Sequence, residues 1–302
     1  MIFKHRKRTV RIYLAGGLGN QLFQLYAGIF FSLKYERELI LDYRNIDVGI
    51  TGREDRINFL DLDALPRLNI VWGNRIEKFF VNMRIKILRR FIRIFDLKEF
   101  FGISIVNEIG FKDIACLRAN QTLFGYFQSW RYVDYVESRI DKIAIRVKQH
   151  SQWYLNLALE IEKIRPIIIH IRLGDYASLS ETFGLLDRVY FENALKSASQ
   201  KTLSRSVFIF SDEPKKAYEV FNNLQGFEFT YIDPPPESKD FESLLLMGSS
   251  DILVISNSTF SWWSAFLSKT PIVYCPDKWF KNMNDPIDLI PAKWNKIPSA
   301  WR

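Results

Sequence analysis

The sequence predicts an α/β protein made of two Rossmann-like domains that meet at a cleft. Short apolar runs of strand composition alternate with stretches of helical spacing, which is the pattern of a parallel sheet covered on both faces. This alternation begins twice, at residue 9 and at residue 167. The chain has 302 residues, 48% of them hydrophobic, which is enough for two domains, expected over 1–160 and 161–302.

The first half opens with an apolar strand, a glycine-rich turn and a long helix. The section from 48 to 101 is harder to assign, apart from a basic helix inside it. The expected elements of this half are a strand over 9–15, a turn over 16–19, a helix over 20–35, strands over 38–42 and 121–127, and helical material over 133–164.

The second half has a more regular alternation, starting with a β-branched run that follows Pro166. Such a run reads as a strand buried on both faces. The expected strands cover 167–171, 207–210, 228–232, 252–255 and 272–274, and the expected helices cover 190–200, 214–222, 240–248 and 259–267.

The formal net charge of +8 admits acidic partners such as nucleotides, nucleic acid, phospholipid or an anionic saccharide carrier. Part of this charge lies in the basic helix expected over 75–93, whose apolar residues recur at steps of three or four. Such a helix suits the surface of an anionic membrane, but an ordinary helix with its apolar stripe in the core has the same pattern. We favour the second interpretation and keep membrane contact as a secondary hypothesis.

Other classes of partner leave no comparable pattern. No run approaches the roughly 20 apolar residues of a membrane span, and the basic start is too short and too charged for a signal sequence. Arginines and aromatic residues do not interleave as they do in a nucleic-acid-binding module. The expectation is a soluble protein, or one that only touches a membrane, without nucleic acid as a partner.

A dense cluster of ionisable residues stands at the end of one expected strand, in His170-Ile-Arg-Leu-Gly-Asp-Tyr176. Ligands of open α/β sheets bind just beyond the carboxyl ends of such strands. The planar guanidinium of Arg172 suits bidentate capture of a phosphate. A structural ion pair between Arg172 and Asp175 that closes a turn would explain the same residues, so the stretch taken alone leaves both interpretations open.

Two turns rich in small residues also join a strand to a helix. Gly16-Gly-Leu-Gly-Asn-Gln21 is neither a Walker A loop nor a dinucleotide fingerprint, yet its three glycines allow close backbone approach by an anion. A tight turn alone would explain one glycine easily and three less easily. Ser256-Asn-Ser-Thr-Phe-Ser-Trp-Trp263 has more short polar side chains than a helix cap needs, which indicates ligand binding.

Two further motifs contain acidic residues. Asp212, in Phe210-Ser-Asp-Glu213, either caps the next helix or accepts hydrogen bonds from a base or sugar. Asp61-Leu-Asp63 has the form of a carboxylate pair that holds Mg²⁺ or Mn²⁺ against a pyrophosphate. So short a pair arises often by chance, and no clear buried strand precedes it, so we do not expect a metal site there.

The ordered set of motifs resembles family eleven of the glycosyltransferases, the α-1,2-fucosyltransferases. Each motif is weak alone, but their order and spacing run through nearly the whole chain. They are Gly16-Gly-Leu-Gly-Asn-Gln-Leu-Phe-Gln24, Gly125-Tyr-Phe-Gln128, His170-Ile-Arg-Leu-Gly-Asp-Tyr176, Phe210-Ser-Asp212, Ser256-Asn-Ser-Thr-Phe-Ser-Trp-Trp263 and Pro276-Asp-Lys-Trp-Phe280.

The resemblance implies a GT-B fold, with two Rossmann-like domains facing each other across a cleft. It implies inverting, metal-independent transfer of L-fucose from GDP-β-L-fucose, with no cofactor. The first domain would then serve the acceptor and the second the donor. The residues implied to bind substrate are Gly17, Gly19, Asn20, Gln21, His170, Arg172, Asp212, Asn257, Ser258, Thr259 and Ser261.

The expected chemistry follows from the charge that develops on the departing GDP. Arg172 and the N–H groups near Ser258 and Thr259 would stabilise it, while Asp175 and Glu181 are candidates for the base that activates the acceptor hydroxyl. Where the family has a second arginine, this chain has Leu173, so any help from a second cation at that place is in doubt.

The acceptor expected from the resemblance is a galactose-type hydroxyl of a glycan, on a lipid-linked O-antigen or capsule unit. The enzyme would be cytoplasmic, working at the inner face of the cytoplasmic membrane. Two alternatives remain at this point: a GT-B glycosyltransferase that uses another nucleotide sugar, and a non-enzymatic basic protein that binds nucleic acid or membrane.

Overall fold

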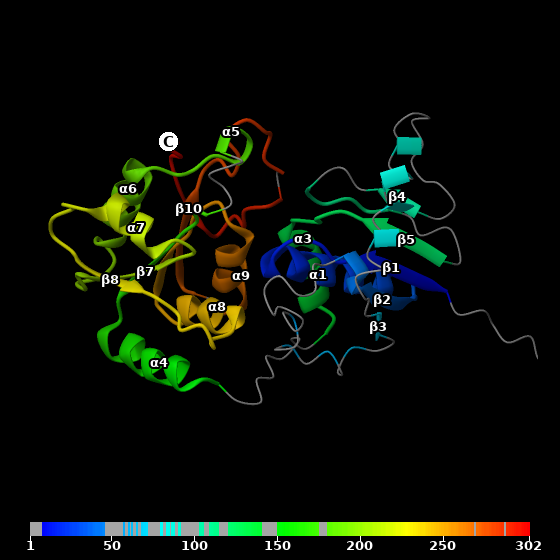
Figure 1. Ribbon diagram of the computed structural model, residues 1–302, viewed down its shortest axis with the longest axis horizontal. Coiled ribbons are helices and arrows are strands. Elements are labelled where there is room, and N and C mark those ends of the chain that lie inside the picture. Colours follow the sequence, from blue (N-terminus) through cyan, green and yellow to red (C-terminus); the bar gives the residue numbers. More distant parts are fainter. Residues whose placement is uncertain are drawn as a thin grey trace, which may run out of the picture. The chain divides into compact units, whose positions relative to one another are not determined.

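The chain forms two compact units. The computed structural model describes residues 8–45, 57, 60, 62, 65, 68–71, 79–80, 83–84, 86–87, 90–91, 103–105, 109–114, 120–140, 150–174, 180–268, 270–286 and 288–302. The first unit comprises residues 1–147 and 286–290, and the second comprises 148–285 and 291–302. Figure 1 shows the elements of both.

The expected boundary between 160 and 161 differs from this division, because it would cut helix α4 (Gln152–Ile164). The start of the second unit is held by Glu242, a buried residue of helix α8 (Asp240–Gly248). Its carboxylate accepts hydrogen bonds from the backbone N–H and the hydroxyl of Ser151, at 2.7 and 2.9 Å. Thus α4 belongs with the second unit from its first residue.

The first unit is a parallel sheet with strand order β3-β2-β1-β5-β4. Helix α1 buries most of its length, and Gly28 lets it approach Leu39 and Ile12 of the sheet closely. The elements are β1 (Thr9–Tyr13), α1 (Leu18–Lys34), β2 (Glu38–Asp42), η1 (Tyr43–Asn45), β3 (Leu68–Val71), β4 (Ile103–Ile105), β5 (Asn120–Phe124) and α3 (Trp130–Glu137).

Residues 286–290 return to the first unit late in the sequence. The Asp288 carbonyl oxygen accepts a hydrogen bond from the Trp130 N–H at 3.0 Å, and its carboxylate accepts one from the Phe111 N–H at 3.3 Å. This return lies within the stretch that the sequence analysis assigned to the second domain.

The second unit is a parallel sheet with strand order β11-β10-β9-β6-β7-β8. Its central strand β6 is buried at every position, as the β-branched run predicts. Besides α4 and α8, the elements are β6 (Ile167–Ile171), α5 (Ser180–Phe183), α6 (Arg188–Ala198), β7 (Ser206–Ser211), α7 (Pro214–Phe221), β8 (Glu228–Ile232), β9 (Ile252–Val254), α9 (Thr259–Leu267), β10 (Ile272–Pro276) and β11 (Asn295–Ile297).

The basic helix expected over 75–93 is described only in part. The described residues 79–80, 83–84, 86–87 and 90–91 are helical and exposed. Phe80, Met83 and Ile87 of the apolar stripe expose 56%, 44% and 48% of their surface. The favoured interpretation, a stripe buried in the core, is therefore wrong at these positions. No helix in the described part of the chain is long and apolar enough to cross a bilayer.

Candidate functional site

The strand order of the second unit creates a topological switch point between β6 and β9. After β6 the chain adds β7 and β8 on one side, and then β9, β10 and β11 on the other. Ligands of parallel sheets bind beyond the carboxyl ends of the strands at such a point. The segments that leave β6 and β9 are joined there, because the Ser256 N–H donates to the His170 carbonyl oxygen at 3.1 Å.

His170, at the end of β6, is 4% exposed and lies with its Nδ1 3.2 Å from the Ser256 hydroxyl oxygen. Burial lowers the pKa of His170 to about 4, with the Asp212 carboxylate opposing the fall and Arg172 adding to it. The imidazole is therefore neutral at pH 7. So low a pKa makes it a weak base, which fits a binding role better than proton abstraction.

Asp212 organises the turn that follows β6. Its carboxylate accepts hydrogen bonds from the backbone N–H groups of Leu173 and Gly174, both at 2.9 Å, and its Oδ2 lies 3.2 Å from Arg172 Nε. A Cβ atom on Gly174 would stand 2.6 Å from the same Oδ2, so this packing requires glycine. Both carboxylate oxygens of Asp212 are thus engaged by the turn, and Oδ2 also pairs with Arg172.

Arg172 forms an ion pair with Asp212, which directly follows the neighbouring strand β7. Asp175, the partner considered from the sequence, lies outside the described residues. The Arg172 side chain keeps 30% of its surface exposed beside Asp212. It therefore combines an anchored position with access from solvent, as a phosphate-binding arginine needs.

Leu173, where the resemblance to the family led us to expect a second arginine, is not part of this exposed side. It is 3% exposed and belongs to the apolar core of the second unit, together with residues such as Ile169 and Tyr190. An arginine side chain there would place its charge among apolar groups in this packing. The substitution therefore changes the core rather than the surface that Arg172 occupies.

The Ser/Asn turn after β9 is also tightly built. The Asn257 side chain is 2% exposed, and its amide donates to the carbonyl oxygens of Phe183, Gly184 and Trp279, at 2.9, 3.2 and 3.2 Å. Asn257 therefore ties three segments of the second unit together. This residue, which was expected to bind substrate, is thus held by hydrogen bonds within the protein.

The remaining residues of this turn form the amino end of α9. The Ser258 hydroxyl accepts from the Phe260 N–H at 3.3 Å, and the buried Ser261 hydroxyl donates to the Ser258 carbonyl oxygen at 3.2 Å. Thr259 is the first helical residue and is half-buried. Since a helix amino end carries partial positive charge, this terminus can stabilise an anion near Arg172's turn.

The glycine turn of the first unit stands at the corresponding switch point, between β1 and β5. Gly16 has a φ of 75°, which favours glycine, and Gly17 precedes α1 as its N-cap without a side-chain cap. Gly19 is buried in the first turn of α1. The Gln21 amide donates to the Gly16 carbonyl oxygen at 2.9 Å and so closes the turn.

Two motifs far apart in the sequence lock together at this turn. The Gln128 amide donates to Asn20 Oδ1, and the Gln24 amide donates to the Gly125 carbonyl oxygen, both at 2.9 Å. Gln24 also accepts from the Ala15 N–H at 2.9 Å. Gln24 and Gln128 lie within the quoted motifs but were not predicted as site residues, because only the strand pairing brings them together.

Two unpaired side-chain oxygens at this turn could each accept a hydrogen bond from a ligand. The side-chain oxygens of Gln21 and Gln128 are buried and have no hydrogen-bond partner among the described residues. A buried acceptor without a partner costs free energy, about 1–3 kcal/mol, unless a ligand or water supplies a donor. Sugar hydroxyls are such donors.

The other acidic candidates are only partly placed. Glu181 lies in the short helix α5, and its side chain is 88% exposed, 3.9 Å from Lys281 Nζ. Asp61 and Asp63, like Asp175, lie outside the described residues. Over the part of the chain that the structure covers, no three His, Cys, Asp or Glu side chains gather in a way that could hold a metal ion.

Comparison with known proteins agrees with these motifs. The family model of glycosyl transferase family 11 matches residues 3–285. The chain is 28% identical to the O-antigen biosynthesis glycosyltransferase WbnK of Escherichia coli, over 90% of this chain and 95% of that protein. It is 25% identical to an α-1,2-colitosyltransferase of Escherichia coli, over 94% and 97% of the two chains.

Among solved structures, the α-1,6-fucosyltransferase NodZ soaked with GDP-fucose is similar in fold, with a TM-score of 0.50 and 13% identity over 93% of this chain and 100% of that one. Two units with parallel sheets, each Rossmann-like, are the GT-B architecture that the sequence predicts. Because the family model spans nearly the whole chain, the protein belongs to glycosyl transferase family 11.

Proposed function

We propose that this protein transfers L-fucose from GDP-β-L-fucose to a galactose-type hydroxyl of a glycan, forming an α-1,2 linkage with inversion and without a metal ion. The proposal rests mainly on the position of Arg172 at the switch point of the second unit, near the amino end of α9. There its side chain is held by Asp212 and still partly exposed. Membership of family 11 and similarity to an α-1,2-transferase support it.

Charge development explains how these groups would act. Cleavage of the fucose–phosphate bond leaves negative charge on the β-phosphate of GDP. The Arg172 guanidinium and the N–H groups at the start of α9, near Ser258 and Thr259, are fixed donors that would stabilise this charge. Because these donors are already oriented by Asp212 and by the turn, little reorganisation is needed during the reaction.

The acceptor hydroxyl attacks the anomeric carbon from the side opposite GDP and loses its proton to a base. Asp175 and Glu181 are our two candidates for that base. The Glu181 carboxylate is exposed to solvent beside Lys281, and His170 is too weak a base for the task. In the first unit, Asn20 and Gln21 would orient sugar hydroxyls.

A donor and acceptor screen tests this proposal. The purified protein is assayed with GDP-fucose and a set of galactose-terminated oligosaccharides, with and without EDTA, and the linkage of any product is read by NMR. We expect an α-1,2-fucosylated product at the same rate in both conditions. A product in another linkage, loss of activity in EDTA, or no transfer to any glycan would contradict the proposal.

A second candidate donor deserves the same assay, because one relative is an α-1,2-colitosyltransferase that matches 94% of this chain. Colitose differs from fucose by lacking one hydroxyl group, so a site that hydrogen-bonds this hydroxyl would discriminate against colitose. A higher kcat/KM with GDP-colitose than with GDP-fucose would establish this alternative. GDP-mannose and UDP-sugars complete the donor panel.

We also propose peripheral contact with an anionic membrane through the helical segment within 75–93. Exposed apolar side chains such as Phe80 and Met83 alternate there with exposed Arg84 and Arg90, which is the composition of an interfacial helix.

Vesicle binding tests this contact. The double variant Phe80→Glu, Met83→Glu should bind about tenfold more weakly than the wild type to vesicles that contain phosphatidylglycerol. Leu203→Glu, at a 96% exposed residue of the second unit, is the matched control. Equal sedimentation of both variants with vesicles would contradict the contact.

A further inference from the structure

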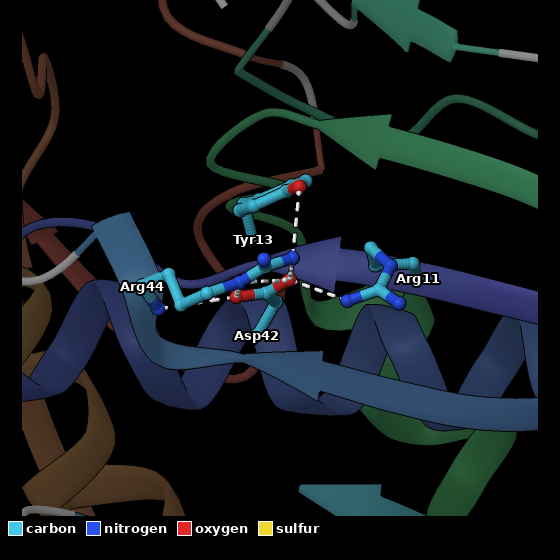
Figure 2. Close-up of polar contacts among 4 residues, drawn as sticks. All are labelled: Arg11, Tyr13, Asp42 and Arg44. Carbon is cyan, nitrogen blue, oxygen red and sulfur yellow. Dashed lines mark hydrogen bonds and ion pairs between the residues drawn. The ribbon is translucent and has the colours of Figure 1, made fainter. Parts of the chain in front are cut away.

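A charged cluster on the sheet of the first unit is not explained by the proposed reaction. Figure 2 shows Asp42, at the end of β2, between Arg11 of β1 and Arg44 of η1, with Tyr13 beside them. The Asp42 side chain is fully buried, whereas the Arg11 and Arg44 side chains keep 26% and 25% of their surface exposed. Two guanidinium groups thus share one carboxylate.

Arg44 alone satisfies Asp42. Its backbone N–H and its Nε donate to Asp42 Oδ1, at 3.1 and 2.9 Å, and its Nη2 donates to Asp42 Oδ2 at 2.6 Å. Arg11 adds one more contact, from its Nη1 to Oδ2. Since a buried carboxylate needs one well-placed cation and its hydrogen bonds, stability of the pair does not account for the second arginine.

The position of Arg11 is also unusual for a charged residue. It lies in the middle of β1, the strand between β2 and β5. Ile12, its neighbour along the strand, packs near Gly28 of α1, so alternation places Arg11 and Tyr13 on the opposite face of the sheet. Apart from Asp42, no described residue accepts a hydrogen bond from the Arg11 side chain.

The surroundings strengthen the positive field. Burial and then the Asp42 carboxylate raise the pKa of the Tyr13 phenol, while Arg44, Arg11 and Arg84 oppose the rise. Arg84 belongs to the exposed helical segment described above, so three cations act at this phenol. Tyr13 itself is fixed by stacking on Phe124 at 4.6 Å between ring centroids.

We propose that Arg11, together with Arg44, binds a phosphate or diphosphate group carried by the acceptor glycan. This inference rests on the proposed function, because it assigns a role to the acceptor of that reaction. The planar fork of Arg11 has donors left over for two oxygens of such a group, and Asp42 Oδ2 accepts from both guanidinium groups and so fixes them beside each other. The donor's own diphosphate has Arg172 in the second unit, so the cluster would serve a different anion.

The test compares three forms of one galactose-terminated disaccharide as acceptor: its methyl glycoside, its reducing-end phosphate, and its diphosphate ester with a medium-length alkyl tail. The variant is Arg11→Gln, which leaves the bonds between Arg44 and Asp42 intact. Arg139→Gln is the control, because it removes one exposed positive charge at the end of α3. KM for each acceptor and for GDP-fucose is measured for all three proteins.

For the wild type we expect a lower KM for both phosphorylated acceptors than for the methyl glycoside. Arg11→Gln should raise KM about tenfold for the phosphorylated forms only, with KM for GDP-fucose unchanged. Arg139→Gln should change neither. A further drop in KM for the alkyl diphosphate, below the KM of the reducing-end phosphate, would identify the source of the group as a lipid carrier; equal KM for both phosphorylated forms would identify a free phosphorylated glycan.

Two results would overturn the inference. One is an Arg11→Gln variant whose KM for the phosphorylated acceptors stays at the wild-type value. The other is a rise in KM for GDP-fucose, which would make the cluster part of the donor site. If no acceptor is fucosylated, the proposed function fails instead; the inference is then decided by calorimetric titration of the phosphorylated disaccharide in saturating GDP, where Arg11→Gln must weaken binding about tenfold.

Discussion

Asp212 decides what the neighbouring residues of the candidate site can do. By accepting hydrogen bonds from the N–H groups of Leu173 and Gly174, it turns the chain so that Arg172 stays accessible and Leu173 enters the core. The sequence placed Asp212 and Arg172 at two strand ends, but not their contact, because the contact depends on β6 and β7 being neighbours. From the sequence, Leu173 stood out only as the place where a second arginine was expected. Its burial in the structure shows that it is a core residue.

Replacing Leu173 with the family's arginine should therefore damage the fold rather than improve the site. Leu173→Arg places an unpaired charge in the core of the second unit and should lower the free energy of unfolding by more than about 3 kcal/mol. Leu173→Met keeps the volume and should cost less than about 1.5 kcal/mol. Urea unfolding measures the free energy of unfolding of both variants. If the arginine variant were as stable as the methionine variant, its side chain would have to extend to solvent instead of entering the core.

His170 should make stability depend on pH. Its pKa is lowered to about 4 in the folded protein, against 6.5 when unfolded, by burial and by Arg172, with Asp212 opposing. Between these values the unfolded chain binds a proton that the folded protein does not, so stability falls as pH drops from 6.5 toward 4, by up to about 1.4 kcal/mol per pH unit.

The matched variant for that measurement is His170→Gln, which removes the titrating ring. The difference in unfolding free energy between wild type and variant should change with pH over this range and level off above pH 7. A difference that stays constant from pH 7 to pH 4.5 would mean that the pKa of His170 is not lowered.

At the scale of elements, the turns after β1 and β5 form one interlocked unit. Sequence patterns predicted α1, β2 and β6 because their apolar runs are long or strictly buried. The short strands β3, β4 and β11 were missed because, unlike the equally short β9, they mix polar with apolar residues and form no continuous apolar run. The hydrogen bonds that lock the two turns together could not be predicted from the sequence either, because they join positions about a hundred residues apart.

Gln24 is the residue on which that lock most depends. Gln24→Leu would leave the Ala15 N–H and the Gly125 carbonyl oxygen without their partner, which should cost about 2–4 kcal/mol in the free energy of unfolding. Gln152→Leu, at an exposed residue of α4 whose side chain donates to Asn156, should cost under about 0.5 kcal/mol. Thermal or urea unfolding of the two variants checks the contrast; equal stability would refute the lock.

At the scale of the whole molecule, the chain combines two parallel-sheet units, each with polar turns at its own switch point. The doubled strand rhythm predicted this organisation. The boundary was misplaced, since the contact of Ser151 with Glu242 and the return of residues 286–290 involve positions far apart in the sequence. The net charge of +8 suits a protein whose proposed substrates are anionic, with Arg172 in one unit and Arg11 and Arg44 in the other.

The central claim is that Arg172 stabilises the departing GDP during fucosyl transfer. Its most direct test is kcat/KM for GDP-fucose in Arg172→Ala, beside Arg205→Ala at an exposed arginine of the second unit. We predict a loss of about 100- to 1000-fold for Arg172→Ala and wild-type turnover for Arg205→Ala. An Arg172→Ala enzyme that transfers fucose at the wild-type rate would contradict the account.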